Sequence, residues 1–248
     1  MSDFPPGSMP PPPPELPPPT SWEPSGQRPS VGTAISWAFG RFKAEFWPFV
    51  GLAAVVVVLW IVEQVSGFVD TGSGVAILLA VIFAVLGFIA QIGVQRAAIR
   101  STQGIRPSMD AMITSQYLGR FILFTICSAL VVVAGAIPGA LIAFLLASST
   151  AGLVIGILLA FAGIVVVYFL LQLGSYYVLD KGYGVGEAMQ ASYEAVSKNI
   201  GPAVLMTLFT GVVLFAASCC GLLTLLTLPF TCLFTAHMYR QFNQEPVH

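Results

Sequence analysis

Residues 121–179 read FILFTICSALVVVAGAIPGALIAFLLASSTAGLVIGILLAFAGIVVVYFLLQLGSYYVL and contain no Asp, Glu, Lys or Arg. The hydrocarbon core of a bilayer is about 30 Å thick, and an α-helix needs roughly 20 residues to cross it. A stretch of 59 uncharged residues is too long for one crossing and suits two. It therefore predicts two membrane-spanning helices joined by a short turn.

Three further stretches have the same character. Residues 199–239 and 71–95 also lack the four charged residue types, and residues 46–66 contain one such residue, Glu63. We predict six transmembrane helices, at residues 46–66, 72–96, 121–146, 152–179, 200–217 and 221–239. The expected fold class is an all-α polytopic membrane helix bundle, because barrel strands instead alternate in segments of about ten residues.

The composition agrees with a membrane protein. Hydrophobic residues make up 56% of the 248 residues and charged residues 8%, against roughly 25% charged in soluble domains. The net charge of −1 gives no general attraction to nucleic acid. His237, His248 and four cysteines in apolar stretches offer no metal-ligand spacing. We therefore expect the lipid bilayer as the environment, with no nucleic-acid partner, metal or cofactor.

The first 30 residues differ from the rest. They hold 12 of the 18 prolines, and proline fixes φ and lacks an N–H donor. We expect a disordered, polyproline II-biased arm at 1–30, a six-helix membrane domain at 31–240 and a short tail at 241–248. The arm is either a ligand for the aromatic-lined groove of a protein partner or a low-complexity tail without a dedicated partner.

All positive charges fall on one side of the six-helix arrangement. They are Arg28, Arg41, Lys43, Arg96, Arg100, Arg106, Arg120, Lys181, Lys198 and Arg240. Loops rich in Lys and Arg stay in the cytoplasm. We predict a multi-pass protein of the plasma membrane with both termini cytoplasmic.

The sequence has a threefold periodicity of 77 residues. Thr33, Asp110 and Glu187 share one register, and a polar-flanked segment precedes an apolar crossing each time. We predict three repeats of an amphipathic helix plus a transmembrane hairpin, with the amphipathic helices along the cytoplasmic interface. The first amphipathic face is expected to hold Val31, Ile35, Ala38 and Phe42, and the third Val185, Ala188, Met189 and Val196. The middle segment, 107–119, is less regular.

The stretch 177–202, YVLDKGYGVGEAMQASYEAVSKNIGP, resembles a motif of bacterial six-span proteins. These are grouped with the membrane domain of glycerophosphoryl diester phosphodiesterases and with the YciC-like uncharacterised proteins. Residues 34–51 and 228–242 look like the same family's first and last segments, and the proline-rich arm like its actinobacterial members. The motif falls on Asp180, Gly182, Glu187, Ala188, Ser192, Lys198 and Asn199. The resemblance implies a six-helix membrane domain without an assigned activity, since the soluble phosphodiesterase domain is not in this chain.

Few polar residues lie within the predicted spans. Gln91 and Gln95 share a helix face, and Tyr168 and Gln172 form a similar stripe. They either line a polar cleft or form interhelical hydrogen bonds. Glu63 is either a proton or cation site or an interfacial carboxylate.

Two functions remain open. The leading hypothesis is a non-enzymatic membrane protein that organises partners or lipids at the cytoplasmic face. The alternative is a small transporter or lipid-handling permease, with Glu63, Gln91, Gln95, Tyr168 and Gln172 around a cleft. An intramembrane enzyme is the weakest hypothesis, because no nucleophile, base and stabiliser group together, so no catalytic residues are assigned.

Overall fold

The computed structural model describes residues 29–69, 74–110, 116–219 and 221–247, and its regular elements in these ranges are helices. They are α1 (Val31–Ala44), α2 (Phe46–Val69), α3 (Gly74–Thr102), α5 (Leu118–Leu145), α6 (Thr150–Leu171), α7 (Gly174–Lys181), α8 (Val185–Lys198), α9 (Ile200–Cys219), the 3-10 turn η1 (Gly221–Leu223) and α10 (Thr224–Phe242). Six spans in the described residues are long and apolar enough to cross a membrane: Phe46–Val65, Ile77–Thr102, Leu118–Leu145, Thr150–Lys181, Ile200–Cys219 and Gly221–Phe242. The all-α fold is confirmed, and the chain is a multi-pass integral membrane protein.

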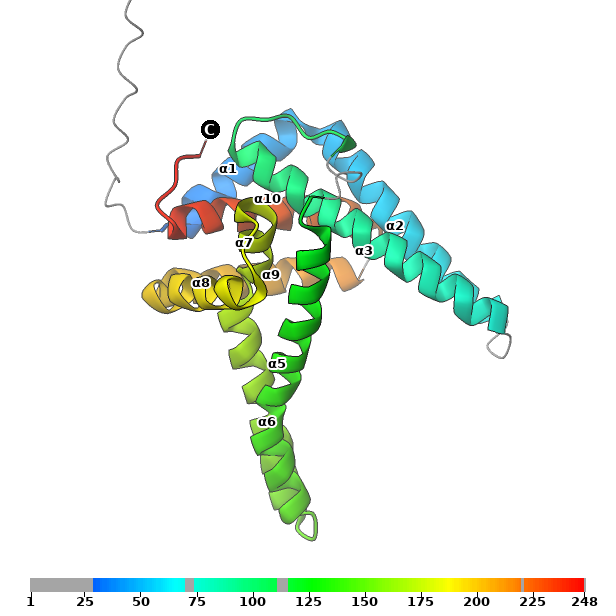
Figure 1. Cartoon of the computed structure of the whole chain (residues 1–248), viewed down its shortest axis with the longest axis vertical. Coiled ribbons are helices and arrows are strands. Elements are labelled where there is room, and N and C mark those ends of the chain that lie inside the picture. The colour runs from blue at the N-terminus through cyan, green and yellow to red at the C-terminus, as the bar shows by residue number, and fades with distance from the viewer. Residues whose placement is uncertain (1–28, 70–73, 111–115, 220, 248) are drawn as a thin grey trace, which may run out of the picture.

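Two long hairpins, α2–α3 and α5–α6, diverge from a common base (Figure 1). α10 packs in this base against α1, α2, α3 and α9, while α8 packs against α5, α6, α7 and α9. The largest fully buried side chains, among them Tyr239, Phe49 and Phe234, lie here. We call this end of the molecule, which carries Arg41, Lys181 and Arg240, the basic end.

The α5–α6 hairpin is held by small residues. A Cβ atom at Gly139 would overlap the Ala160 backbone, and one at Gly163 would overlap the Gly135 carbonyl. The two helices therefore touch through their backbones, which is how helices gain dispersion energy when lipid removes the hydrophobic driving force. The outward faces carry large apolar side chains such as Phe144, which is 77% exposed, and suit contact with lipid tails.

The first and third predicted repeats appear as α1 before α2–α3 and α8 before α9–α10. Ala38, Ala188 and Val196 lie in the core, and the other residues of the two predicted apolar faces pack partly buried against it. In the second repeat, α5–α6 follows residues 107–119, of which 111–115 lie outside the described residues. The amphipathic helix predicted there stays a prediction.

Two differences from the predicted spans bear on the site. α3 continues six residues beyond position 96, so Arg100 also lies on the helix. The predicted fourth span is two helices, α6 and α7. Its break is stabilised by Ser192 of α8, whose hydroxyl accepts from the Leu173 N–H at 3.2 Å and donates to the Leu170 carbonyl at 2.8 Å. Position 192 thus supplies the hydrogen bonds that a continuous helix would have made within itself.

Candidate functional site

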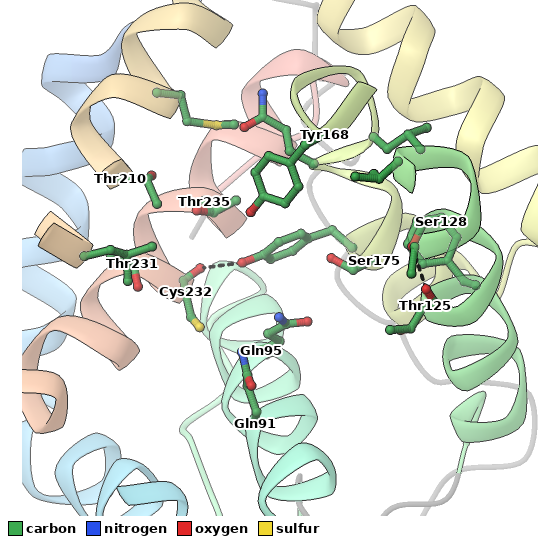
Figure 2. Close-up of a pocket in the computed structure, with 18 of the residues that line it drawn as sticks. Gln91, Gln95, Thr125, Ser128, Tyr168, Ser175, Thr210, Thr231, Cys232 and Thr235 are labelled. Atoms are coloured by element: carbon green, nitrogen blue, oxygen red, sulfur yellow. Dashed lines mark hydrogen bonds between the residues drawn. The ribbon is translucent and has the colours of Figure 1, made fainter. Parts of the chain in front are cut away.

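Four of the five polar positions singled out in the sequence line one cavity of about 490 Å³. Gln91 and Gln95 lie one turn apart on α3, and Figure 2 shows them projecting toward the ring of Tyr168 across the cavity. Gln172, at the break between α6 and α7, completes the set. We call this space the glutamine cavity. Tyr168 is 60% exposed, which places it at the cavity's rim.

Four helices add hydroxyl and thiol groups to the same walls. Thr125 and Ser128 come from α5, Thr210 from α9, and Thr231, Cys232 and Thr235 from α10 (Figure 2). Ser175 and Tyr176 come from α7, which continues the α6 wall. Apart from Tyr176, which extends the stripe of Tyr168 and Gln172, these residues were not predicted from the sequence, although Thr231 and Thr235 have the same i,i+4 spacing as the glutamines.

Several of the hydroxyl groups are already satisfied by backbone carbonyls. Ser128 Oγ donates to the Thr125 carbonyl at 3.0 Å, Thr231 Oγ1 to that of Thr227 at 2.8 Å, and the Tyr176 hydroxyl to that of Cys232 at 3.4 Å. Such bonds leave the donor hydrogen occupied and the oxygen lone pairs available. These positions therefore present acceptors to the cavity more than donors.

Two amide atoms differ from these hydroxyl groups in their hydrogen bonding. Gln95 Oε1 and Gln172 Nε2 are buried and have no hydrogen-bond partner within the described part of the chain. Gln172 Oε1 lies 2.9 Å from Thr207 Oγ1, whose single hydrogen is also 2.9 Å, oxygen to oxygen, from the Ala203 carbonyl. A buried polar group without a partner costs about 1–3 kcal/mol. Such groups in a cavity mark a place where a ligand's polar atoms fit.

The glutamine cavity carries no formal charge, because Asp, Glu, Lys, Arg and His are all missing from the described residues that line it. It offers hydrogen bonds and apolar contact, and no acid–base pair for proton transfer. Three His, Cys, Asp or Glu side chains that could hold a metal ion together are not found in the described ranges.

Glu63, the fifth position, lines a neighbouring cavity of about 570 Å³. Val56, Trp60 and Phe88 contribute to its walls, and we call it the apolar cavity. The two cavities share Gln91, Leu214 and Leu228. The structure thus places Glu63 in the apolar cavity and outside the glutamine cavity.

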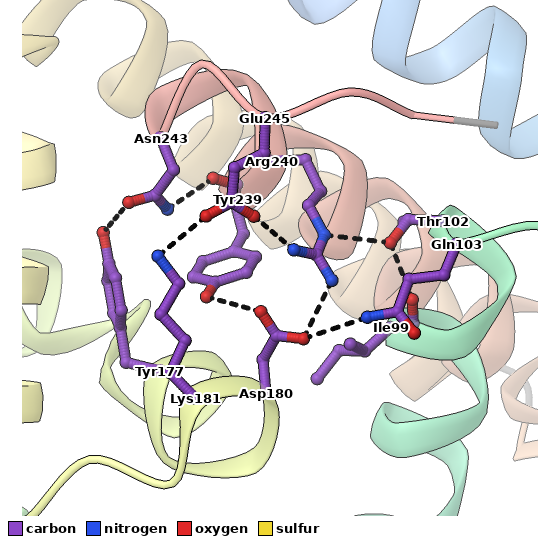
Figure 3. A network of polar contacts seen from close by, with 10 residues as sticks. All are labelled: Ile99, Thr102, Gln103, Tyr177, Asp180, Lys181, Tyr239, Arg240, Asn243 and Glu245. Atoms are coloured by element: carbon purple, nitrogen blue, oxygen red, sulfur yellow. Dashed lines mark hydrogen bonds and ion pairs between the residues drawn. The ribbon is translucent and has the colours of Figure 1, made fainter. Parts of the chain in front are cut away.

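The motif residue Asp180 lies at the basic end, in a network that ties α3, α7 and α10 together (Figure 3). Its carboxylate pairs with Arg240 at 2.8 Å and accepts from the Tyr239 hydroxyl at 3.0 Å and from Gln103 Nε2 at 3.3 Å. Arg240 Nε also donates to Thr102 Oγ1 at 3.1 Å. These contacts join the ends of three helices that line the glutamine cavity.

The tail after α10 extends this network. Glu245 pairs with Lys181 at 2.7 Å and with Arg240, and the Tyr177 hydroxyl donates to Asn243 Oδ1 at 2.8 Å. Burial raises the pKa of Glu245, but hydrogen bonds to Lys181 and Arg240 and their positive charge outweigh it, so the pKa is lowered overall. Glu245 therefore holds the tail to α7 in its ionised form.

The other motif positions also serve the fold. Gly182 ends α7 with φ +67°, and a Cβ there would lie 2.6 Å from the Tyr117 ring. Glu187 accepts from the Gly184 N–H at 3.0 Å, which caps α8. Ala188 and Ser192 are fully buried, Lys198 pairs with Glu194 at 3.1 Å on the surface, and Asn199 Nδ2 donates to the Ala195 carbonyl at 2.9 Å. The motif residues lie on and around α7 and α8, outside the described lining of the glutamine cavity.

The resemblance to the six-span family therefore points to scaffold positions, and it stays a prediction. No family model matches the chain, and neither a curated protein nor a solved structure matches it.

Proposed function

We propose that this integral membrane protein binds a lipid-like amphiphile in the glutamine cavity and handles it within the membrane. This is the second of the two hypotheses drawn from the sequence, and one observation carries it. Gln95 and Gln172 line a cavity inside the membrane spans, and one buried amide atom of each, Gln95 Oε1 and Gln172 Nε2, has no hydrogen-bond partner in the described part of the chain. Lipid tails cannot form hydrogen bonds, so they cannot offset the free-energy cost of an unpaired amide group. A polar ligand group bound in the cavity can offset it.

The residues that line the cavity favour ligand binding over catalysis. The described lining residues include no carboxylate, imidazole or amine, so the cavity has no general acid or base beside its hydroxyl and thiol groups. We therefore propose a non-enzymatic role. The exposed rim at Tyr168 supports entry of the ligand from the side, within the membrane.

The test is recovery of bound lipid. The full chain is purified in mild detergent from membranes, and the ligands that remain attached are released and identified by mass spectrometry. Gln95→Leu should lose the ligand, while Gln64→Leu, an exposed glutamine outside both cavities, should keep it. Equal ligand recovery from both variants would overturn the proposal. Proteoliposome uptake of the identified ligand then separates transport from binding alone.

We also propose that the basic end faces the cytoplasm. The support is that Lys181 and Arg240 share Glu245 as an ion-pair partner and that α1, which carries Arg41, packs against α10, so the three positive charges gather at one end as the positive-inside rule requires. Reporter fusions after Lys181 and after the final residue should both report the cytoplasm. Opposite faces for the two fusions would refute this orientation.

The organising role is the second candidate. The Ser30 N–H donates to Gln241 Oε1 at 2.7 Å, so the start of α1 is held beside the end of α10 at the basic end. The proline-rich arm, which lies outside the described residues apart from its last two positions, joins the protein there. Pull-downs with the full chain and with residues 1–28 deleted test it, and an unchanged set of partners would remove the arm as a tether.

A further inference from the structure

The two cavities are stacked along the spans. On α3, Gln95 lines the glutamine cavity, Gln91 lines both, and Ala84 lines the apolar cavity. Eleven residues separate Gln95 from Ala84, about 16 Å at 1.5 Å per residue. Gln95 is the nearer of the two to Thr102, where α3 meets Arg240, so the glutamine cavity is the one closer to the basic end.

α9 and α10 show the same order. On α9, Met206 lines the glutamine cavity and Ala217 the apolar cavity, and on α10 Thr235 and Thr224 do so respectively. All three helices therefore give the same order of the two cavities, although α9 runs away from the basic end and α3 and α10 run toward it. The two cavities adjoin at Gln91, Leu214 and Leu228, and their walls are polar near the basic end and apolar farther from it.

This order matches that of an amphiphile in one leaflet of a bilayer. The head group of such a molecule lies near the membrane surface, and its chain extends toward the midplane. Val57, Trp60 and Phe88 supply apolar walls for a chain. Glu63, in the last turn of its span, marks the far end of the apolar cavity.

The head group must be uncharged. Of the charged residues at the ends of the lining helices, Asp180 and Arg240 pair with each other at 2.8 Å. Arg96 follows Gln95 in sequence, but its guanidinium donates to the Gln116 carbonyl, outside the described lining. A phosphate or an ammonium group in the cavity would be buried without a counter-ion, which is strongly unfavourable.

The head group must also both donate and accept a hydrogen bond. Gln95 offers an unused acceptor, Oε1, and Gln172 an unused donor, Nε2. A head group with hydroxyls supplies both, since each hydroxyl carries one donor hydrogen and two acceptor lone pairs. We infer, on the basis of the proposed function, that the ligand is a single-chain amphiphile with a neutral, hydroxyl-bearing head group. Its head group lies in the glutamine cavity, and its chain occupies the apolar cavity.

The experiment uses the full chain in detergent micelles and native mass spectrometry. The protein is offered an equimolar mixture of 1-monooleoylglycerol, oleoyl lysophosphatidic acid and methyl oleate. These share one chain and differ in a hydroxyl, an anionic and a donor-free head group. We expect monooleoylglycerol to be retained at least tenfold over the other two, about 1.4 kcal/mol. Excess free glycerol should not displace it.

Three variants locate the binding. Gln172→Met removes the Nε2 donor at similar length and without a charge, and Thr207 Oγ1 keeps the Ala203 carbonyl as its acceptor at 2.9 Å, so retention should fall about tenfold. Ala84→Phe narrows the apolar cavity and should reduce retention of all three probes, while Gln64→Leu should change none. Gln172→Met is close enough in size to fold when Gln95→Leu does not.

The outcomes separate the inference from the proposed function. Retention of lysophosphatidic acid equal to that of monooleoylglycerol, and sensitive to position 172, would overturn the neutral head group and leave an amphiphile site. Displacement by free glycerol would show a soluble polyol as ligand and overturn the role of the chain. Retention that is the same in every variant would overturn both.

Discussion

Replacing Asp180 by alanine tests whether the network at the basic end holds the helices together. The Asp180 side chain is 8% exposed, and its carboxylate binds Arg240, Tyr239 and Gln103. Alanine removes all three interactions and leaves the Arg240 guanidinium, 10% exposed, with Glu245 as its remaining carboxylate partner in the described network. The protein should therefore become markedly less stable.

The magnitude follows from the burial of the pair. Removing one partner of a buried ion pair costs about 3–5 kcal/mol, because the other charge is left without compensation. Glu245 stays beside Arg240, so we expect about 3 kcal/mol for Asp180→Ala. One kcal/mol shifts the Tm of a chain of this length by about 2–4 °C, which gives a decrease of about 6–12 °C.

Thermal unfolding in detergent micelles, followed by tryptophan fluorescence, measures this change. Glu194→Ala is the matched control, because Glu194 and Lys198 form an ion pair whose side chains are 47% and 73% exposed. Exposed pairs contribute little, so the Tm should hardly change. The double variant Asp180→Leu/Arg240→Met removes both charges and should recover stability relative to Asp180→Ala. A Tm loss in Asp180→Ala no larger than in the control would refute the reasoning.

Three further changes probe other parts of the fold. Gly163→Leu places a side chain against the α5 backbone and should cost about 1–3 kcal/mol or more, whereas Gly211→Leu, whose Cβ position is open, should be tolerated in the same Tm assay. Ser192→Ala strips two backbone groups at the α6–α7 break of their partner, and should cost about 2 kcal/mol or more without abolishing helicity by circular dichroism. Because hydrogen bonds to Lys181 and Arg240 lower the pKa of Glu245 against the effect of burial, its stabilising effect is present above its unfolded pKa of about 4.3 and is lost as the pH falls through the lower folded value. The Tm deficit of Glu245→Gln should accordingly shrink between pH 6 and pH 3, and a deficit that is constant with pH would contradict this.

The spans were predictable because their cause is local. A helix can cross the bilayer when about 20 residues in a row are apolar and uncharged, and residues 121–179 are long enough for two such helices. The break between α6 and α7 was not predictable, because it depends on the hydroxyl of Ser192, which lies about 20 positions later in the chain. The continuation of α3 through Arg96 was missed for a related reason, since its long side chain reaches the Gln116 carbonyl and so tolerates a helical position.

The candidate site was half predictable. Gln91 and Gln95 share a face on any helix, so their common direction follows from their spacing. Which helices that face meets depends on tertiary packing, and no local pattern places Thr210 or Tyr176 opposite them. Glu63 was grouped with the glutamines by polarity alone, and the structure separates it along the span into the apolar cavity.

The network and the glutamine cavity share the same three helices, which explains how residues outside the cavity determine its shape. Asp180 lies one turn from Tyr176 on α7, about 6 Å along the axis. Arg240 lies beyond Thr235 on α10 and binds Thr102, at the end of the helix that carries Gln95. The pairing at the basic end therefore sets the spacing of the three helices before each one reaches the cavity. The motif residue Asp180 is therefore linked through α3, α7 and α10 to the glutamine cavity, although it is not among the described residues that line the cavity.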